Sequence, residues 1–372
     1  MNILISLPYF PLENTGTGNS VYGLSKGLIA AGANVTVLAE SEKFEILKYK
    51  EVPYIEFSKE KSKNPFKVSR QLLSYLRDNK NSIDLLILNG IFVPYVYTLS
   101  KFANDIGLPY IHIPHGVYND VAFVKSRFKK LVYFKFFESK VIDGALAVQM
   151  LSHSQYSALK AKAKPKNIIS FPHGVDSSLL VCAKTVDSGE RDPSKIKIIF
   201  WGRKDIYIKG LDLLVKAFSN IDDSNVELHI QGLDIGETEE LINLISRLKI
   251  SNITLKEKYT GNPLDVLKKY DFMIMPSRLE AFSMAVVEGM LAGLPIVVSE
   301  EVGAAEYVEL AGAGILCRPD EDSIRQAIEK MLKMHKEWGK LGEKGRNYMI
   351  EQLSWETIGK KVLKKYKELL NA

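Results

Sequence analysis

Two glutamates in the second half of the chain have a spacing that suits a ligand rich in phosphate and hydroxyl groups. Glu280 lies in a short loop after a predicted buried strand, and Glu288 follows inside a predicted helix, with seven residues between them. The free N–H groups of Ser283, Met284 and Ala285 could face a diphosphate, and Ser283 could cap the helix. The two carboxylates could accept hydrogen bonds from sugar and ribose hydroxyls. An ordinary surface position beside a capped helix is the alternative, since most glutamates are exposed.

Two basic side chains could neutralise the charge of such a ligand. Arg203 follows the first predicted strand of the second half, and Lys209 opens the next predicted helix. A guanidinium and an ammonium at these places could stabilise a diphosphate leaving group. Because lysine and arginine are common in loops, a pair of solvated charges is the alternative.

The first half offers a glycine-containing turn and a histidine. Gly16 and Gly18 lie between the first predicted strand and the first predicted helix, where the backbone could approach a phosphate closely. A tight turn without a ligand would have the same sequence. His115 follows a predicted strand at the end where α/β proteins form their sites. A structural role is the alternative for a lone histidine.

Apolar runs of strand length alternate with amphipathic segments of helix length through both halves. Runs of Val, Ile and Leu separated by helices predict parallel strands that are covered on both faces. The predicted strands are Asn2–Leu7, Asn34–Ala39, Ile83–Asn89, Pro109–Ile113, Gly144–Leu151, Ile168–Phe171, Lys195–Trp201, Val226–Gln231, Asn252–Leu255, Phe272–Met275, Pro295–Ser299 and Gly314–Leu316. The predicted helices include Gly18–Ala31, Val93–Asp105, Lys209–Ser219, Glu237–Leu248, Ala285–Ala292, Asp322–His335 and Glu356–Leu370.

The length of 372 residues suits two domains better than a single core. The polar and weakly periodic segment Val181–Ser194 is typical of a linker. We therefore expect an α/β fold of two Rossmann-like domains, each a doubly wound parallel sheet, facing each other across a cleft. The expected domains are 1–176 and 177–354, followed by a terminal helix at 355–372.

One segment resembles a known family signature. The sequence PSRLEAFSMAVVEGMLAGLPIVVS, from Pro276 to Ser299, is similar to the E-x7-E signature of the family-4 retaining glycosyltransferases, which have the GT-B fold. The family usually has Glu-Gly-Phe-Gly where this chain has Glu280–Ser283, so the backbone has less conformational freedom here. The resemblance implies transfer of a hexosyl group from a UDP- or GDP-sugar with retention of the anomeric configuration. The implied acceptor is a saccharide or a lipid-linked saccharide of a cell-surface polysaccharide.

The resemblance also assigns roles to single residues. Arg203 and Lys209 would bind the donor diphosphate, and Glu288 would bind the ribose. His115 and Glu280 would contact the transferred sugar as the catalytic residues. The other donor-binding residues that it implies are Gly16, Gly18, Lys258, Tyr259, Phe282, Ser283 and Met284, with Lys258 and Tyr259 near the base.

The same resemblance covers the organisation of the chain. It implies an acceptor-side domain at 1–176, a donor domain at 177–354, and a last helix that crosses back to the first domain. His173, in Pro172–Asp176, replaces the asparagine of a family segment that joins the two domains. This segment is therefore expected to act as a hinge.

The basic segment 123–140 mixes lysines and arginine with six aromatic residues. A helix of this kind can lie on anionic lipid, and the resemblance implies such docking in several related enzymes. A helix that covers the sheet with its aromatic residues is the alternative.

Charge, cysteine content and short motifs limit the classes of partner, location and cofactor that we expect. The net charge of +6 is compatible with an anionic partner without selecting one, and we expect no nucleic-acid partner. Two distant cysteines and the absence of a signal-like N-terminus predict a cytoplasmic protein, possessing at most a peripheral membrane contact. The run Asp320–Asp322 is better explained as the start of a helix than as a metal motif, so we expect no metal and no cofactor.

Two other classes remain open at this level. One is a nucleotide-sugar epimerase or another non-transferring enzyme on the same fold, and the other is an inactive partner subunit that binds nucleotide-sugar. An epimerase would turn over the donor without an acceptor. A partner subunit would bind the donor without turnover.

Overall fold

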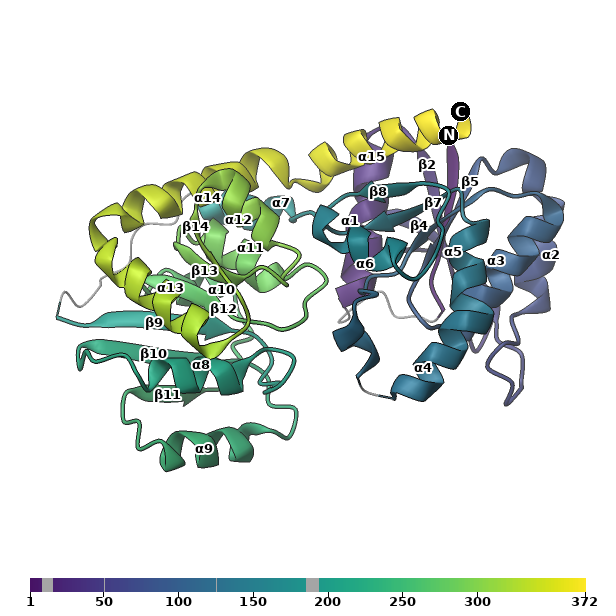
Figure 1. Ribbon diagram of the computed structural model, residues 1–372. Helices are drawn as coiled ribbons and strands as arrows, with labels where there is room; N and C mark the ends of the chain where they lie inside the picture. The colour runs from purple at the N-terminus through teal and green to yellow at the C-terminus, as the bar shows by residue number, and fades with distance from the viewer. Residues whose placement is uncertain (9–15, 50, 125, 185–193) are drawn as a thin grey trace. The chain divides into compact units, whose positions relative to one another are not determined.

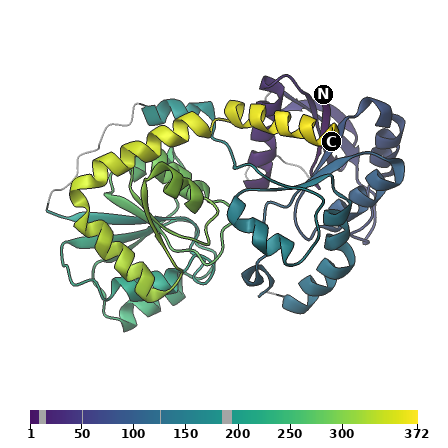
Figure 2. The same ribbon diagram turned by 45° about the horizontal axis from the view of Figure 1, so that its top comes forward.

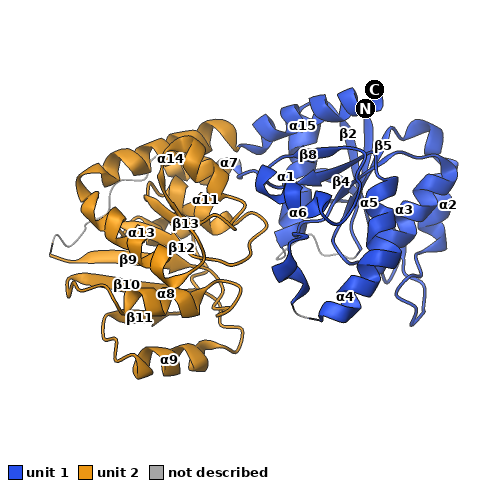
Figure 3. Cartoon of the chain, in the orientation of Figure 1, with its two compact units in different colours: residues 1–176, 354–372 blue, residues 177–353 orange. Residues whose placement is uncertain are grey.

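The computed structural model describes residues 1–8, 16–49, 51–124, 126–184 and 194–372 (Figure 1). These residues form two compact units, which Figure 3 colours separately: unit 1 comprises 1–176 and 354–372, and unit 2 comprises 177–353. Two features of the sequence lie partly outside the described residues, namely the basic segment 123–140, at Lys125, and the predicted linker Val181–Ser194, at 185–193. No helix among the described residues is both long enough and apolar enough to cross a membrane.

Unit 1 contains one sheet, with the described strands in the order β3-β4-β2-β1-β5-β6-β7-β8. Every pair is parallel except β3 with β4, which is antiparallel. The strands are β1 (Asn2–Ser6), β2 (Asn34–Ser41), β3 (Glu45–Tyr49), β4 (Val52–Ser58), β5 (Leu85–Asn89), β6 (Tyr110–Ile113), β7 (Ala147–Met150) and β8 (Ile168–Ser170). Helices cover both faces, which explains why a central strand such as β5 is buried along its whole length.

The helical segments of unit 1 include the last one in the chain. The α-helices are α1 (Gly16–Ala30), α2 (Arg70–Asp78), α3 (Pro94–Ile106), α4 (Arg127–Tyr133), α5 (Ser139–Gly144), α6 (Tyr156–Lys160) and α15 (Trp355–Leu370), and the π-helical turn η3 (Phe134–Glu138) joins α4 to α5. Helix α15 lies against α1 (Figures 1 and 2). Their backbones approach so closely that a Cβ atom on Gly27 would lie 2.2 Å from the carbonyl oxygen of Trp355.

Unit 2 contains a second sheet, with the described strands all parallel and in the order β11-β10-β9-β12-β13-β14. In this doubly wound order, β10 and β11 lie on one side of β9, and β12 to β14 lie on the other. Ligands of such sheets bind at the carboxyl ends of the strands, beside the point where the strand order reverses. The strands are β9 (Ile196–Trp201), β10 (Val226–Gln231), β11 (Ile253–Lys256), β12 (Phe272–Met275), β13 (Ile296–Ser299) and β14 (Gly314–Cys317). The helices are α7 (Ser177–Lys184), α8 (Leu211–Phe218), α9 (Thr238–Arg247), α10 (Pro263–Leu267), α11 (Met284–Leu291), α12 (Ala305–Ala311), α13 (Glu321–Lys333) and α14 (Trp338–Gln352).

The α/β class and the two Rossmann-like sheets are confirmed, and three local predictions are wrong. Gly16 and Gly18 belong to the first turn of α1 rather than to a loop before it. The start of the predicted linker, 181–184, is the end of helix α7. The strands β3 and β4 were not predicted. The residues of β3 are mostly exposed and polar residues interrupt its apolar pattern, and Pro53 and Glu56 interrupt the apolar run of β4. The interpretation of Asp320 as a helix start is confirmed, because its side chain accepts the N–H of Ser323 at 2.8 Å.

Candidate functional site

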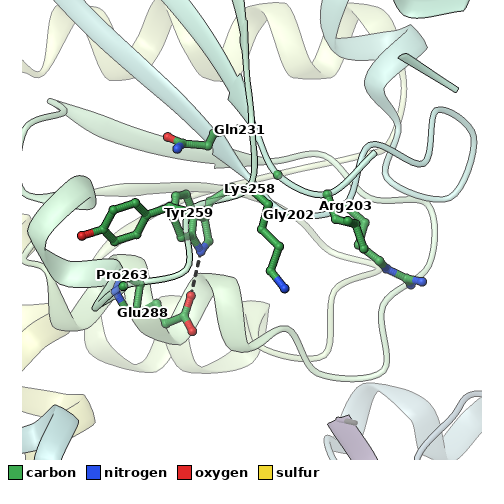
Figure 4. Close-up of a pocket in the computed structure, with 11 residues that line it drawn as sticks. Gly202, Arg203, Gln231, Lys258, Tyr259, Pro263 and Glu288 are labelled. Atoms are coloured by element: carbon green, nitrogen blue, oxygen red, sulfur yellow. Dashed lines mark hydrogen bonds between the residues drawn. The ribbon is translucent and has the colours of Figure 1, made fainter. Parts of the chain in front are cut away.

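A cavity of about 390 Å³ lies in unit 2 at the carboxyl ends of its strands (Figure 4). Four residues that the sequence singled out line it together: Arg203, Lys258, Tyr259 and Glu288. The other lining residues, which the sequence analysis did not select, are Trp201, Gly202, Gln231, Gly232, Leu233, Gly261 and Pro263. The strand-end rule could have indicated Trp201 and Gln231, because they are the last residues of β9 and β10.

Glu288 is held in the wall of this cavity by Trp201. The indole Nε1–H of Trp201 donates to Oε2 of Glu288 at 2.8 Å (Figure 4). Burial raises the pKa of Glu288 from 4.5 to about 7, and the hydrogen bond from Trp201 opposes this rise. The site therefore presents a fixed carboxyl group whose charge changes near neutral pH.

Lys209 and Glu280 form an ion pair in the same unit, although 71 residues separate them in the sequence. Burial and the nearby charge of Arg203 lower the pKa of Lys209 from 10.5 to about 8. Arg203 lines the cavity, and its charge also acts on Lys209 of the ion pair. Two cations close together form a favourable site for a diphosphate.

The start of α11 has an unusual backbone. Ser283 has φ 91° and ψ 92°, a conformation that is strained for a residue with a side chain. The prediction that its side chain caps the helix is wrong, because Oγ of Ser283 is buried and makes no hydrogen bond in the described structure. The first N–H groups of α11 have no partner within the helix, as in any helix, so they can still serve an anion.

Two neighbours of Ser283 differ in their accessibility. The Phe282 side chain is buried and packs against Tyr307, with 5.8 Å between the ring centroids, so it is not a ligand contact in this structure. Met284, the first residue of α11, is 37% exposed. The sequence-based assignment of Phe282 to donor binding can therefore hold only for its backbone.

A second pocket, of about 250 Å³, lies in unit 1 and includes His115. Its walls come from the segments after β1, β5 and β6 and from the first turn of α1, so it also lies at the carboxyl ends of parallel strands. The lining residues are Leu7, Pro8, Thr17, Gly18, Asn89, Gly90, Ile91, Val93, Pro114 and His115. Gly18 and His115 thus lie in one pocket, whereas Gly16 is not among its lining residues.

The hydrogen bonds around His115 define its tautomer. The side chain of Asn89 donates from Nδ2 to the carbonyl of Ser6 at 3.1 Å, which leaves Oδ1 as an acceptor. Nε2 of His115 lies 2.7 Å from that Oδ1 and must therefore carry the proton. Its Nδ1 holds the lone pair and has no partner in the described part of the chain.

His173 also affects the protonation state of His115. The two imidazoles stack with 5.6 Å between centroids and an angle of 6° between planes. Burial, reinforced by the neighbouring His173, lowers the pKa of His115 well below 6.5, and burial lowers the pKa of His173 to about 4. Both rings are consequently neutral at physiological pH. His115 also has φ 53°, a left-handed backbone conformation that is uncommon for a residue with a side chain.

Comparisons with known proteins show consistent similarities. A family described as Glycosyl transferases group 1 matches residues 184–348, and one described as Glycosyltransferase Family 4 matches residues 14–179. An uncharacterised glycosyltransferase from Methanocaldococcus jannaschii is 24% identical over 308 residues, which are 82% of this chain and 80% of that protein.

Solved structures resemble the whole chain. Sucrose-phosphate synthase from Thermosynechococcus elongatus has a TM-score of 0.73 at 17% identity, over 100% of this chain and 99% of the other. HepE from Anabaena, solved with UDP and glucose, has a TM-score of 0.69 at 16% identity, over 99% and 100%. At these identities, the structures show a shared fold.

Proposed function

Because this chain belongs to the family-4 glycosyltransferases and has their GT-B fold, we propose that it transfers a hexosyl group from a nucleoside-diphosphate sugar to a saccharide or lipid-linked saccharide. The observation that carries this proposal is the cavity of unit 2, where Arg203, Lys258, Tyr259 and Glu288 meet at the strand ends. Cell-surface polysaccharide biosynthesis is the proposed setting. The transfer is proposed to retain the anomeric configuration and to need no metal.

The proposed role of each residue follows from the chemistry of its side chain. Arg203 and Lys209 neutralise the diphosphate as charge develops on it, which is worth several kcal/mol where water is excluded. Glu288 accepts hydrogen bonds from the ribose, and Lys258 with Tyr259 lies beside the base. The N–H groups at the start of α11, near Ser283 and Met284, add the positive end of a helix dipole.

Glu280 and His115 are proposed to contact the transferred sugar. Glu280 can accept hydroxyl hydrogen bonds once the diphosphate has taken its place beside Lys209. His115 is neutral and acts as a hydrogen-bond acceptor through Nδ1. This differs from a cationic role, which its burial and the stacking with His173 oppose.

A uridine nucleotide is the first donor to test. HepE, which has the same fold, was solved with UDP and glucose, and this supports UDP-glucose as the first probe. The test is isothermal titration of UDP, GDP and their glucose and mannose conjugates into wild type and Glu288→Ala, with the exposed Glu343→Gln as control. We expect one nucleotide to bind wild type and the control, and to bind Glu288→Ala at least tenfold more weakly.

Turnover then separates the remaining classes. Incubation of the donor with and without acceptor sugars, followed by NMR of the product anomer, should give an acceptor-dependent product with the donor configuration. Conversion of the donor alone would indicate an epimerase. Binding without any turnover would indicate a partner subunit, and failure of every nucleotide to bind would contradict the proposal as a whole.

Contact with anionic lipid is proposed for helix α4 and the turn that follows it. Phe128, Leu131, Val132 and Phe136 recur at helical spacing and are 81%, 44%, 38% and 52% exposed. Exposed basic residues, Arg127, Lys129 and Lys135, lie among them. Phe123 and Phe134 are instead buried in the unit 1 core, as the alternative of a helix that covers the sheet predicts. An exposed apolar row with basic neighbours suits an anionic membrane surface.

Vesicle sedimentation tests this contact. The wild-type protein should bind phosphatidylglycerol vesicles and bind phosphatidylcholine vesicles weakly. The double substitution Phe128→Ser and Leu131→Ser should reduce binding at least fivefold. Ile242→Ser, at a 48%-exposed position of α9, is the matched control. Equal binding of all three proteins would contradict the proposed contact.

A further inference from the structure

We propose that Trp201 is a positioning residue for Glu288, whose indole N–H holds the carboxylate in the orientation and charge state that bind the nucleotide. The inference rests on the proposed function, in which Glu288 binds the donor ribose. It concerns a residue outside the signature Glu280–Glu288, at the last position of β9.

The geometry gives Trp201 two roles in the cavity. Its ring lines the wall at the end of β9, and its N–H reaches Glu288 on α11 at 2.8 Å (Figure 4). An indole N–H can only donate, so this bond fixes Oε2 of Glu288 as an acceptor. The orientation of the carboxyl group is thereby set before any ligand arrives, and Oε1 remains for a hydroxyl donor.

The other two tryptophans do not have this arrangement. The N–H of Trp338 donates to the carbonyl of Met331 at 3.0 Å, inside unit 2 and away from the cavity lining. Trp355 belongs to unit 1, where it packs against Gly23 and Gly174. Trp338 is therefore a matched control, because it is an N–H donor of the same type in the same unit.

The hydrogen bond matters because the carboxylate is buried. Burial raises the pKa of Glu288 to about 7, and the N–H of Trp201 acts in the opposite direction. A donor to the charged form favours that form, and a bond of this kind is stronger than one between neutral groups. Without Trp201, the carboxyl group would hold its proton to a higher pH and lose acceptor capacity.

The neighbouring charges do not replace this bond. Arg203, Lys258 and Tyr259 are the other ionisable side chains that line the cavity. Around α11 itself, Asp265 of α10 is exposed, and Arg346 of α14 donates to the carbonyls of Leu291 and Ala292 at the far end of the helix. Trp201 alone makes a direct hydrogen bond to the Glu288 carboxylate in the described structure.

The experiment measures the dissociation constant of UDP, or of GDP if that nucleotide binds the wild type more tightly, at pH 6, 7, 8 and 9. Wild type, Trp201→Phe and Trp338→Phe are compared. Phenylalanine keeps an aromatic ring in place and removes the N–H. The ratio of the variant constant to the wild-type constant at each pH cancels the titration of the nucleotide phosphate.

We expect the Trp201→Phe ratio to be large at pH 6 and to fall towards a constant value at pH 9. Each unit by which the pKa of Glu288 rises should weaken binding about tenfold at the acidic end. The Trp338→Phe ratio should be independent of pH. A Trp201→Phe ratio that is equal at pH 6 and pH 9 would overturn the inference and leave the proposed function intact. If neither nucleotide binds the wild type, the proposed function fails first.

A second measurement does not depend on the folding of Trp201→Phe. The tryptophan fluorescence of unliganded wild type should change with a midpoint near pH 7, because protonation of Glu288 alters the acceptor of the Trp201 N–H. Glu288→Gln should abolish this transition. A transition that persists in Glu288→Gln, or one that is absent from the wild type, would contradict the coupling between the two residues.

Discussion

Lys209 and Glu280 neutralise each other in the unliganded unit 2, where Arg203 adds a second positive charge nearby. The carboxylate of Glu280 thus lies where the proposed role of Lys209 requires a diphosphate. Binding of a nucleoside diphosphate would exchange one anion for another at Lys209. Glu280 would then be released towards the sugar.

Replacement of Glu280 should separate nucleotide binding from transfer. Glu280→Gln removes the competing charge, so the affinity for UDP or GDP should rise about fivefold, corresponding to roughly 1 kcal/mol for a partly exposed ion pair. Transfer should fall at least a hundredfold, because the sugar loses a charged acceptor. Calorimetry and a transfer assay measure the two effects. The exposed Glu300→Gln should change neither, and weaker nucleotide binding by Glu280→Gln would contradict the exchange.

The buried carboxyl group of Glu288 should make stability depend on pH. Its pKa is about 7 in the folded protein and 4.5 ordinarily, so the folded state binds the proton more tightly between these values. The free energy of unfolding should therefore fall as the pH rises from 4.5 to 7, by about 3 kcal/mol from this group. Denaturant unfolding at pH 4.5 and pH 8 measures the difference. Glu288→Gln should remove this component, and an unchanged difference in that variant would contradict the assignment.

The strained backbone at Ser283 should limit the stability of unit 2. Glycine adopts a positive φ without steric cost, so Ser283→Gly should raise the free energy of unfolding by about 1 kcal/mol. Ser283→Ala is the matched control, because it removes the unpartnered hydroxyl and keeps the strain. Thermal unfolding should therefore rank the glycine variant above the alanine variant. Equal stability of the two variants, or the reverse order, would show that the positive φ of Ser283 does not limit the stability of unit 2.

The neutral state of His115 should be visible in the pH profile of transfer. Because its pKa lies well below 6.5, wild type should show no loss of rate from this ring between pH 6 and 8. Asn89→Asp places a carboxylate beside Nε2 and favours the imidazolium, whose Nδ1 can no longer accept a hydrogen bond. The rate should then fall about tenfold at pH 6 and recover at higher pH.

Asn34→Asp, at an exposed position of unit 1, is the control for that profile. Nucleotide affinity should be unchanged in Asn89→Asp, since Asn89 lies in the pocket of unit 1. A decline with a midpoint near pH 6.5 that occurs in wild type and persists in Glu288→Gln, where position 288 cannot titrate, would show that His115 itself titrates during turnover.

The sequence by itself determined the class of the fold and the resemblance to the glycosyltransferase family. Buried strands such as β5 and β12 are continuous apolar runs, and local composition is enough to predict them. The spacing of Glu280 and Glu288 is also a local pattern, and the family resemblance rests on it. The polar edge strand β3 has no such run, because one side of an edge strand is not covered by the sheet.

Only the tertiary structure decided which atoms meet. Trp201 and Glu288 are 87 residues apart, and Asn89 and His115 are 26 residues apart, so no local pattern links them. The positive φ of Ser283 likewise depends on how the loop before α11 packs, and a serine in the sequence does not indicate it. Hydrogen-bond partners, tautomers and shifted pKa values arise from burial and from contacts between distant segments, and the packing of the folded chain fixes both.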